Sequence, residues 1–239
     1  MLREIGIYLG LKWDKLKWQL GDKKSGTYYS QHGQDKLLAE KIFPQKRNGI
    51  FVDIGANDGI AFSNTYFLEQ IGWNGLAIEP IPSVYQALVE NRRCIAINGC
   101  IAPRSGKGRF RVINGYSQML SGLVDEYDPR HLKRIERELS SNGGSYEDVE
   151  VDCYKLNELL ETHGIAQVDY LSIDVEGAEF DILNSIDFAA LRIDVVSVEN
   201  NYLDARIPEL LAARGFEFHT RVGVDFFYIN ARKNDDLQA

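Results

Sequence analysis

The chain has 239 residues, of which 44% are hydrophobic and 26% are charged, which is the composition of an ordinary globular protein. Its net charge of −8 and its isoelectric point of about 5.1 exclude nucleic-acid binding as the main function, because proteins of that class carry a basic face. No linker-like stretch or internal repeat interrupts the sequence, so one large domain is expected.

The cysteines and the hydropathy pattern bear on where the protein works. Cys94, Cys100 and Cys153 are odd in number and have no zinc-ligand spacing, so they are expected to be buried thiols in a reducing compartment. No secretory signal is recognisable, and no run reaches the roughly 20 apolar residues that a membrane span needs. The sequence therefore predicts a cytoplasmic protein.

Residues 1–28 are predicted to form an N-terminal amphipathic helical extension. Apolar residues recur there at helical spacing, namely Leu2, Ile5, Leu9, Trp13, Leu16 and Leu20. Residues 1–24 also carry six Lys and Arg against three Asp and Glu, and a basic helix of this kind can lie peripherally on an anionic membrane surface. The alternative is a helix packed on its own domain or on a second subunit of a homodimer. This alternative is favoured, because most amphipathic stripes face a protein core.

Residues 29–239 are predicted to form one α/β domain in which helices and strands alternate. The first elements are a helix within 30–43, a strand at 49–55, a helix at 63–72, a strand at 76–80, a helix at 82–92 and a strand at 94–102. After a less regular region follow a helix at 156–164, a strand at 168–174, a helix at 176–186, a strand at 193–199 and a helix at 207–215. Two closely spaced strands, 216–220 and 225–230, complete the pattern.

This order of elements predicts a Rossmann-like sheet of seven mostly parallel strands with helices on both faces. The strands are apolar almost throughout, as expected for strands that are covered on both sides. The last two strands are too close together for a helical crossover, so they are expected to form an antiparallel hairpin at one edge. Residues 103–150 contain a short strand at 108–113, a polar loop at 114–122 and a charged helix around 131–140. This region is predicted to be an insertion or a cover for an acceptor site.

The carboxyl ends of the predicted strands carry the candidate site, because ligands bind beyond these ends in sheets of this kind. The residues at these ends are Asp53, Glu79, Cys100 with Ile101, Asp174 and Glu199. A single carboxylate at such a position is usually a solvated loop residue. Parallel strands bring all of these residues to one edge of the sheet, which favours a common site.

The stretch FVDIGANDG, residues 51–59, leaves a strand through an acid and two glycines. Gly55 and Gly59 allow a tight turn and a close approach of a ligand to the backbone. Glu79 follows where a Rossmann-type fold places an acid against ribose hydroxyls. The dinucleotide pattern G-x-G-x-x-G is missing, which disfavours a nicotinamide oxidoreductase. Because Asp53 would repel a pyrophosphate and attract an ammonium or sulfonium group, the pattern indicates S-adenosylmethionine.

Several stretches together resemble the FkbM family of S-adenosylmethionine-dependent methyltransferases. These are SQHGQD, FVDIGANDG, SNTYFLEQIGWNGLAIEPIPSVYQALVENRR and VDYLSIDVEGAEFDIL. The likeness runs from about Tyr29 to Asn230 and is weakest in 103–150. It implies a class I methyltransferase fold and O-methylation of a hydroxyl, often on a sugar, a glycan or a natural product.

The resemblance also implies a set of cofactor-binding residues. Asp53, Gly55, Asn57 and Gly59 would contact the amino-acid part of S-adenosylmethionine. Glu79 would hold the ribose with Pro80 beside it, Cys100 or Ile101 would lie near the adenine, and Asp174 would complete the set. Asn64 with Ser63, together with Gln31 and Asp35, would close the pocket.

Two stretches, IDVEGAE and SVENNY, would supply the chemistry. Methyl transfer requires an oriented acceptor oxygen, and an alcohol needs a base or a metal to activate it. Asp174, Glu176 and Glu199 are the predicted catalytic residues. Asp174, Glu199 and Asn200 also offer hard oxygen ligands for Mg²⁺ or Mn²⁺, similar to the metal site of catechol-type O-methyltransferases. In the alternative without a metal, Asp174 acts alone as base or orienting group and Glu199 binds the substrate.

The alternative to an enzyme is a non-catalytic, membrane-associated adaptor that uses the same fold. That hypothesis predicts a damaged cofactor site. Asp53, Gly55, Gly59, Glu79 and Asp174 are all present, which favours the enzyme.

Overall fold

The computed structural model describes residues 28–232. The predicted helical extension over residues 1–28 lies almost entirely outside this range, so its membrane or subunit contacts stay predictions. Within the described range, no helix has both the length and the hydropathy of a membrane span.

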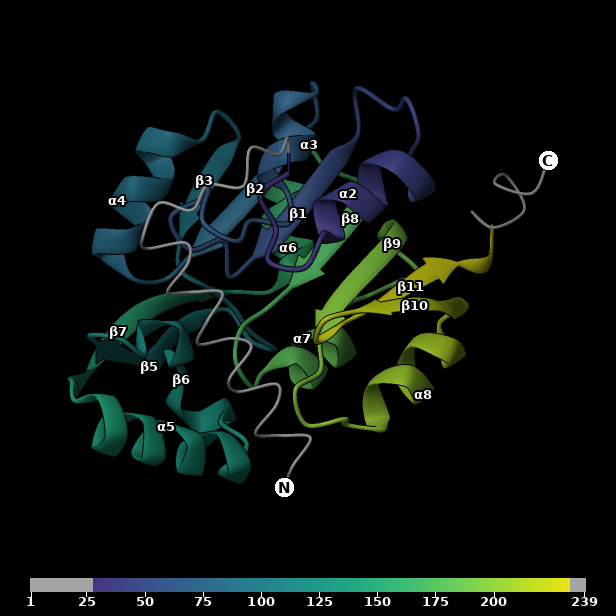
Figure 1. The fold of residues 1–239 in the computed structure, drawn as a ribbon. Coiled ribbons are helices and arrows are strands. Elements are labelled where there is room, and N and C mark those ends of the chain that lie inside the picture. Colours follow the sequence, from purple (N-terminus) through teal and green to yellow (C-terminus); the bar gives the residue numbers. More distant parts are fainter. Residues whose placement is uncertain (1–27, 233–239) are drawn as a thin grey trace.

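A seven-stranded sheet forms the centre of the molecule (Figure 1). Its strands are β1 (Ile50–Ile54), β2 (Asn74–Glu79), β3 (Ile95–Asn98), β8 (Gln167–Ile173), β9 (Arg192–Glu199), β10 (Phe216–Val222) and β11 (Asp225–Asn230). Their order across the sheet is β10-β11-β9-β8-β1-β2-β3. β11 runs in the direction opposite to the other six strands, which confirms the predicted seven-stranded, mostly parallel sheet. The terminal hairpin places β11 inside the sheet and leaves β10 at the edge.

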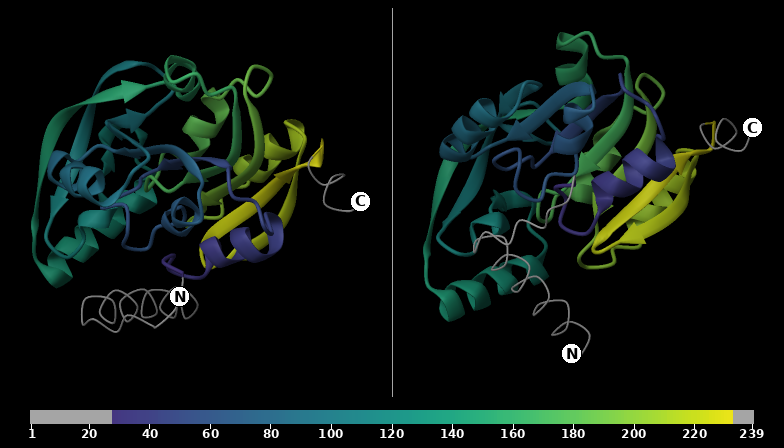
Figure 2. Two further views of the ribbon diagram at one scale, coloured as in Figure 1. Left: turned by 90° about the horizontal axis from the view of Figure 1, so that it is seen from above. Right: turned by 45° about the horizontal axis from the view of Figure 1, so that its top comes forward.

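Helices cover both faces of this sheet, as the alternation of elements predicted (Figure 2). One face carries α2 (Gln34–Leu37), the π-helix η1 (Leu38–Ile42), α3 (Tyr66–Gln70) and α4 (Pro82–Asn91), and the other carries α6 (Leu156–Thr162), α7 (Glu179–Ser185) and α8 (Arg206–Ala213). Successive strand residues alternate between the two faces. Phe51 therefore packs with Leu38 and Leu68, whereas Val52 packs with Leu160 and Ile182.

A second sheet of four strands stands beside the main one, in the order β4-β7-β5-β6. Its strands are β4 (Cys100–Ile101), β5 (Gly106–Asn114), β6 (Gly122–Leu123) and β7 (Ser145–Tyr154). The single strand predicted over 94–102 is therefore wrong, because the chain leaves the main sheet at Gly99 and enters the small one. A Cβ at Gly99 would lie 2.7 Å from the carbonyl oxygen of Asp152 and 2.7 Å from the ring of Tyr154, so only glycine permits this crossing.

Strand β7 was not predicted. Its residues Val149, Val151 and Cys153 alternate with acids, which is the period-two pattern of a strand with one covered face. Val151 and Cys153 pack on Phe110 and other apolar residues of the small sheet. The alternating pattern was present in the sequence, but the many exposed acids of this segment resemble those of a loop.

The charged helix predicted around 131–140 is α5 (Pro129–Asn142). It begins where the side chain of Asp128 accepts a hydrogen bond from the backbone N–H of Arg130, as an N-cap does. Its apolar residue Ile135 packs on Ile113 of the small sheet. Two short 3₁₀ turns, η2 (Gln118–Leu120) and η3 (Val124–Glu126), precede it. Figure 1 shows α5 alongside β5, β6 and β7, away from the main sheet.

We expect Gly99→Ala to destabilise the protein more than Gly106→Ala. Both glycines have positive φ, 158° and 140°, but a Cβ at Gly106 meets nothing within 4 Å. Gly106→Ala should cost about 1 kcal/mol of backbone strain, and Gly99→Ala should cost roughly 1–3 kcal/mol more from the clash with β7. Urea unfolding of both variants measures the difference. Equal losses would contradict the close crossing at Gly99.

Candidate functional site

A cavity lies between the carboxyl ends of the central strands and the small sheet. It holds about 820 Å³ of empty space, including the part that opens to solvent. Its walls are Ile54, Gly55, Asn57, Ile78, Glu79, Pro80, Ile81, Val84, Gly99, Cys100, Ile101, Phe110, Gln118, Met119, Ser121, Leu123, Asp174, Val175, Glu176 and Ala178. Of the predicted site residues, the cavity brings together Gly55, Asn57, Glu79, Pro80, Cys100, Ile101, Asp174 and Glu176.

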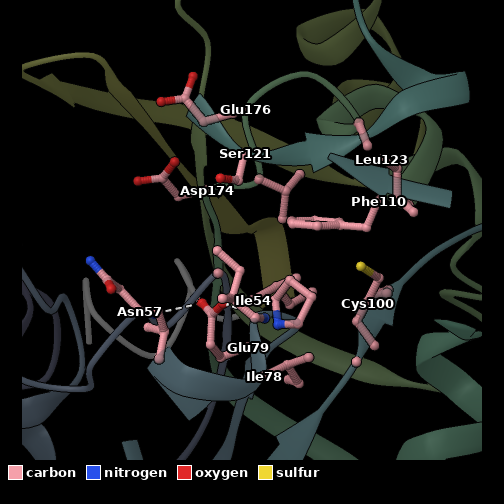
Figure 3. Close-up of a pocket in the computed structure, with 18 of the residues that line it drawn as sticks. Ile54, Asn57, Ile78, Glu79, Cys100, Phe110, Ser121, Leu123, Asp174 and Glu176 are labelled. Carbon is pink, nitrogen blue, oxygen red and sulfur yellow. Dashed lines mark hydrogen bonds between the residues drawn. The ribbon is translucent and has the colours of Figure 1, made fainter. Parts of the chain in front are cut away.

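The cavity has an apolar end and an acidic end (Figure 3). Phe110, Leu123 and Cys100 from the small sheet line one end, and Asp174 and Glu176 stand at the other. An apolar end suits a planar ring, and an acidic end suits a cation or a hydroxyl group. The small sheet, which comes mostly from the 103–150 region, therefore forms one wall of the cavity.

Glu79 ends β2 at the floor of the cavity and is buried. Its two carboxylate oxygens accept hydrogen bonds from the backbone N–H groups of Asn57 at 3.1 Å and of Ile81 at 2.8 Å. Burial raises the pKa of Glu79 to about 7, against the lowering effect of these two bonds. Asn57 has φ of 51°, a conformation that Asn tolerates better than most residues. Glu79 thus fixes the turn that follows β1.

The two glycines of this turn are needed by the chain itself. Gly55 has φ of 90°, and a Cβ there would lie 1.8 Å from the carbonyl oxygen of Asp174. Gly59 has φ of 81°, and a Cβ there would lie 2.6 Å from the side chain of Arg92. The close approach that the sequence suggested for a ligand is, at these two positions, an approach of the protein's own residues. Gly55 also lines the cavity, so a ligand contact at its backbone remains compatible with this packing.

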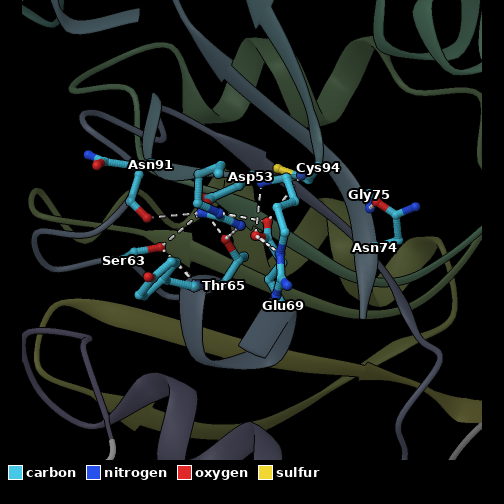
Figure 4. Close-up of polar contacts among 12 residues, drawn as sticks. Asp53, Ser63, Thr65, Glu69, Asn74, Gly75, Asn91 and Cys94 are labelled. Atoms are coloured by element: carbon cyan, nitrogen blue, oxygen red, sulfur yellow. Dashed lines mark hydrogen bonds and ion pairs between the residues drawn. The ribbon is translucent and has the colours of Figure 1, made fainter. Parts of the chain in front are cut away.

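Asp53 lies outside the cavity walls, in a buried polar network (Figure 4). Its carboxylate accepts a hydrogen bond from the hydroxyl of Thr65 at 2.5 Å. Arg92 donates to the same hydroxyl at 3.0 Å, to the carboxylate of Glu69 at 2.8 Å and to the carbonyl of Gly59 at 3.1 Å. Burial raises the pKa of Asp53, whereas the charge of Arg92 lowers it. The contact between Asp53 and a cofactor stays a prediction, and the structure gives this residue a packing role as well.

Asn64 reaches the neighbourhood of the strand ends from the start of α3. Its Nδ2 donates to the hydroxyl of Ser172 on β8 at 3.2 Å. Its Oδ1 is buried and has no hydrogen-bond partner among the described residues. A buried acceptor without a partner is rare. Asn64 is not among the residues that line the cavity, so its contact with a cofactor stays a prediction. The adjacent Ser63 is occupied by the backbone N–H of Tyr66.

Gln31 and Asp35 are not brought to the cavity walls. Asp35 is buried, and its carboxylate accepts hydrogen bonds from the backbone N–H groups of Tyr29 at 2.6 Å and Ser30 at 3.2 Å. These bonds fix the segment before α2, which forms an isolated bridge between Ser30 and Phe62. Both cofactor contacts stay predictions, and Asp35 stabilises its own turn.

An acid cluster, formed by Asp174, Glu176 and Glu199, stands at the polar end of the cavity. Each of the three carboxylates offers an oxygen that lies within 4.8 Å of the other two. Burial raises the pKa of Asp174 and of Glu199, and the negative charges of the neighbouring acids raise both further. This pair is therefore suited to hold a proton between its members.

Asn200, the predicted third metal ligand, is bonded to the turn that follows β9, and its role as a ligand stays a prediction. Its Oδ1 accepts a hydrogen bond from the backbone N–H of Asp204 at 2.7 Å, and its Nδ2 donates to the carbonyl of Asp204 at 3.2 Å. These bonds hold the turn between β9 and α8. Glu176 instead occupies the third position beside Asp174 and Glu199, so the candidate ligand set for a hard cation is three carboxylates.

Two residues of α5 reach the acid cluster. Neither of them was a predicted site residue. Arg134 donates from Nη1 to a carboxylate oxygen of Glu176 at 3.1 Å, and Nδ1 of His131 lies 3.5 Å from the same oxygen. The two residues are three apart, which places them on one face of the helix. That spacing within a charged run was the available signal, but the sequence does not show which face meets the strand ends.

A second cavity adjoins the first at the acid cluster. Glu176 lines both cavities, Asp174 lines the first and Glu199 lines the second. The second cavity has aromatic walls, Tyr127, Phe180 and Tyr202, and polar residues that include Asp128, Arg130, Asp204 and Arg206. The acid cluster therefore lies between a partly apolar compartment and a polar, aromatic one.

Comparison with known proteins finds a family model and several relatives that are similar to this chain. Residues 53–218 match the family model described as the methyltransferase FkbM domain. "Methyltransferase 1" of Beauveria bassiana (strain ARSEF 2860) is 28% identical over 164 residues, which span 64% of this chain and 64% of that protein's length. "Methyltransferase sdnD" of Sordaria araneosa is 27% identical over 216 residues, which span 79% of this chain and 83% of that protein.

Solved structures that are similar to the chain include two methyltransferases. Methyltransferase FkbM from Methylobacillus flagellatus KT is 13% identical, with a TM-score of 0.47, over 82% of this chain and 47% of that one. A TehB-like SAM-dependent methyltransferase from Corynebacterium glutamicum is 11% identical, with a TM-score of 0.43, over 93% of this chain and 96% of that one.

We expect Arg92→Met to destabilise the protein by about 3–5 kcal/mol, because it leaves the buried carboxylate of Glu69 without its partner. The neighbouring Arg93→Met is the matched control. Arg93 lies 3.7 Å from the same carboxylate, but 74% of its side chain is exposed, against 0% for Arg92. Its loss should cost no more than about 1 kcal/mol. Chemical denaturation measures both values, and equal effects would show that burial does not set the strength of this pair.

Proposed function

The chain belongs to the methyltransferase FkbM family, and from this premise we propose that it transfers a methyl group from S-adenosylmethionine to a hydroxyl of a sugar, a glycan or a natural product. The observation that carries the proposal is the single cavity that runs from Glu79 to the acid cluster. One end of it has groups for a nucleoside, and the other has groups for activating a hydroxyl.

The cavity residues fit S-adenosylmethionine. Glu79 is a buried carboxylate, and within the described residues each of its two oxygens accepts one backbone hydrogen bond. Both oxygens therefore keep a lone pair for the two ribose hydroxyls. Phe110 and Ile101 supply apolar surface for the base. When bound, S-adenosylmethionine supplies an electrophilic methyl group on a sulfonium.

The acid cluster accepts the proton of the acceptor hydroxyl. A carboxylate is a competent base near neutral pH only when its pKa is raised toward that range. Burial and neighbouring acids raise the pKa of Asp174 in this way. We assign the proton to the carboxylate of Asp174, with Glu199 beside it, and we assign the orientation of the hydroxyl to Glu176.

The second cavity supports a polar acceptor with several hydroxyl groups. It presents the aromatic faces of Tyr127, Phe180 and Tyr202 beside charged groups. Aromatic faces next to hydrogen-bonding groups suit the alternating apolar and polar surface of a sugar ring. This lining favours a sugar or a hydroxylated natural product over a purely apolar acceptor.

The acid cluster also allows a second form of the same reaction. Its three carboxylates are hard oxygen ligands that suit Mg²⁺ or Mn²⁺, and an ion held there would lower the pKa of a hydroxyl. Sensitivity to a chelator separates this form from one in which Asp174 acts as a base without a metal.

S-adenosylhomocysteine is expected to bind and to raise the melting temperature. At 100 times its dissociation constant it should stabilise the folded protein by about 2.7 kcal/mol. Because ribose hydroxyls favour the ionised form of Glu79, whose pKa is about 7 without ligand, binding below pH 7 should release a proton. Affinity should therefore fall by up to about tenfold per pH unit below 7 and level off above it.

Calorimetry at pH 6 in two buffers with different ionisation enthalpies measures this proton. Glu79→Gln should weaken binding and remove the pH dependence, while Glu90→Gln, on the exposed side of α4, should change neither. Absence of any stabilisation by S-adenosylhomocysteine would favour the non-catalytic adaptor.

Asp174→Asn is expected to lower turnover by about 10²–10⁴-fold, because it removes a general base, while the stabilisation by S-adenosylhomocysteine stays. Mass spectrometry of a panel of glycan and natural-product acceptors measures the methylated product. Glu161→Gln, on the exposed face of α6, is the control for loss of a carboxylate. Unchanged turnover in Asp174→Asn would remove this residue from the mechanism, and full turnover in EDTA would exclude the metal form.

A further inference from the structure

We propose that Arg134 is the built-in cation of the acid cluster, that it positions Glu176, and that it takes the place which a divalent metal would otherwise fill. The inference deepens the proposed function and rests on it for the role of the cluster in methyl transfer.

Arg134 is placed to balance the charge of the cluster. Its Nη1 donates to Glu176 at 3.1 Å, and its side chain is 23% exposed against 11% for Glu176. Burial lowers the pKa of Arg134, and the negative charges of Glu176 and Glu199 raise it above its ordinary value. The guanidinium thus contacts the cluster at Glu176.

The helix that carries Arg134 is fixed against the main domain. Arg130 donates to the carbonyl of Tyr202 at 3.1 Å and lies over its ring at 4.7 Å. His131 is fully buried, and Tyr127 stacks on its ring with the centroids 5.1 Å apart. The N-cap at Asp128 holds the first turn. Because these contacts surround Arg134 on its own helix, its guanidinium has a defined position.

His131 does not supply the charge. Its Nε2 lies 3.1 Å from the carbonyl of Leu120, to which it donates. Its Nδ1 lies 3.2 Å from the hydroxyl of Tyr202, which can donate to it, and burial lowers the pKa of His131. A ring that donates at one nitrogen and accepts at the other is neutral. Arg134 is therefore the cationic group that contacts Glu176 directly from this helix.

The backbone at Glu176 shows why a fixed partner is required. Glu176 has φ of 60°, a conformation that is uncommon for residues other than glycine and that persists only where the surroundings hold it. Arg134 and His131 both lie within 3.5 Å of its carboxylate. The bond from Arg134 holds the side chain toward Asp174 and Glu199, so the three carboxylates stay together.

A divalent ion on the same carboxylates would meet the guanidinium at close range. Like charges a few ångströms apart repel strongly in a poorly solvated site. The cluster with Arg134 in place therefore has little affinity for a divalent ion. Removing only the charge of Arg134 leaves three carboxylates within 4.8 Å of one another, which is a ligand set for Mn²⁺.

The experiment measures Mn²⁺ binding by electron paramagnetic resonance on the wild-type protein and on a set of single and double variants. Arg134→Gln should bind one Mn²⁺ at least about a hundredfold more tightly than the wild type, because a like charge beside the ion is gone. Arg134→Lys keeps the charge and should bind as weakly as the wild type. Lys133→Gln removes a charge from the exposed side of the same helix and should also match the wild type. Adding Glu199→Gln to Arg134→Gln should abolish the new site.

Two results would overturn the proposal. One is a wild-type protein that binds Mn²⁺ as tightly as Arg134→Gln does, in a manner that Glu199→Gln removes. The other is an Arg134→Gln protein that is folded by its melting curve and still gains no Mn²⁺ affinity. Thermal stabilisation by S-adenosylhomocysteine is recorded on the same samples. Its loss in every protein, wild type included, would count against the proposed function, whereas the Mn²⁺ results would still decide the role of Arg134.

Discussion

The site depends on the hydrogen bonds and the ion pair that the buried guanidinium of Arg92 makes. This guanidinium joins Glu69 of α3, the hydroxyl of Thr65 and the carbonyl of Gly59, and it reaches Asp53 through Thr65. A buried charge of this kind is stable only while its partners are present. The network therefore fixes the loop after β1, and that loop places the backbone N–H which binds Glu79.

The cavity exists because the chain changes sheets at Gly99. The strand that begins in the main sheet as β3 continues as β4 in the small one, which brings Cys100 and Ile101 to the cavity wall. Strands β5 and β6 then complete that wall with Phe110 and Leu123. The floor of the site is thus set by the parallel sheet, and its opposite wall is set by the segment that follows it.

The sequence predicted those parts of the fold that rest on local pattern. Apolar strands alternating with amphipathic helices gave the seven-stranded sheet, and the parallel topology brought Glu79 and Asp174 to one edge. Contacts between distant residues were beyond its reach. The sequence did not show that Asp53 bonds to Thr65 beside Arg92, or that Asn200 bonds to Asp204. Strand β7 was missed because its exposed acids resemble a loop.

The region with the weakest pattern supplies a cation to the acid cluster. Helix α5 has a charged surface because it lies at the outside of the molecule, yet one of its faces turns inward and carries His131 and Arg134 to Glu176. Glu176 lines both cavities, so the group that Arg134 holds stands where cofactor and acceptor would meet. A change in this helix can therefore alter the charge at the point of transfer while the cofactor cavity around Glu79 stays the same.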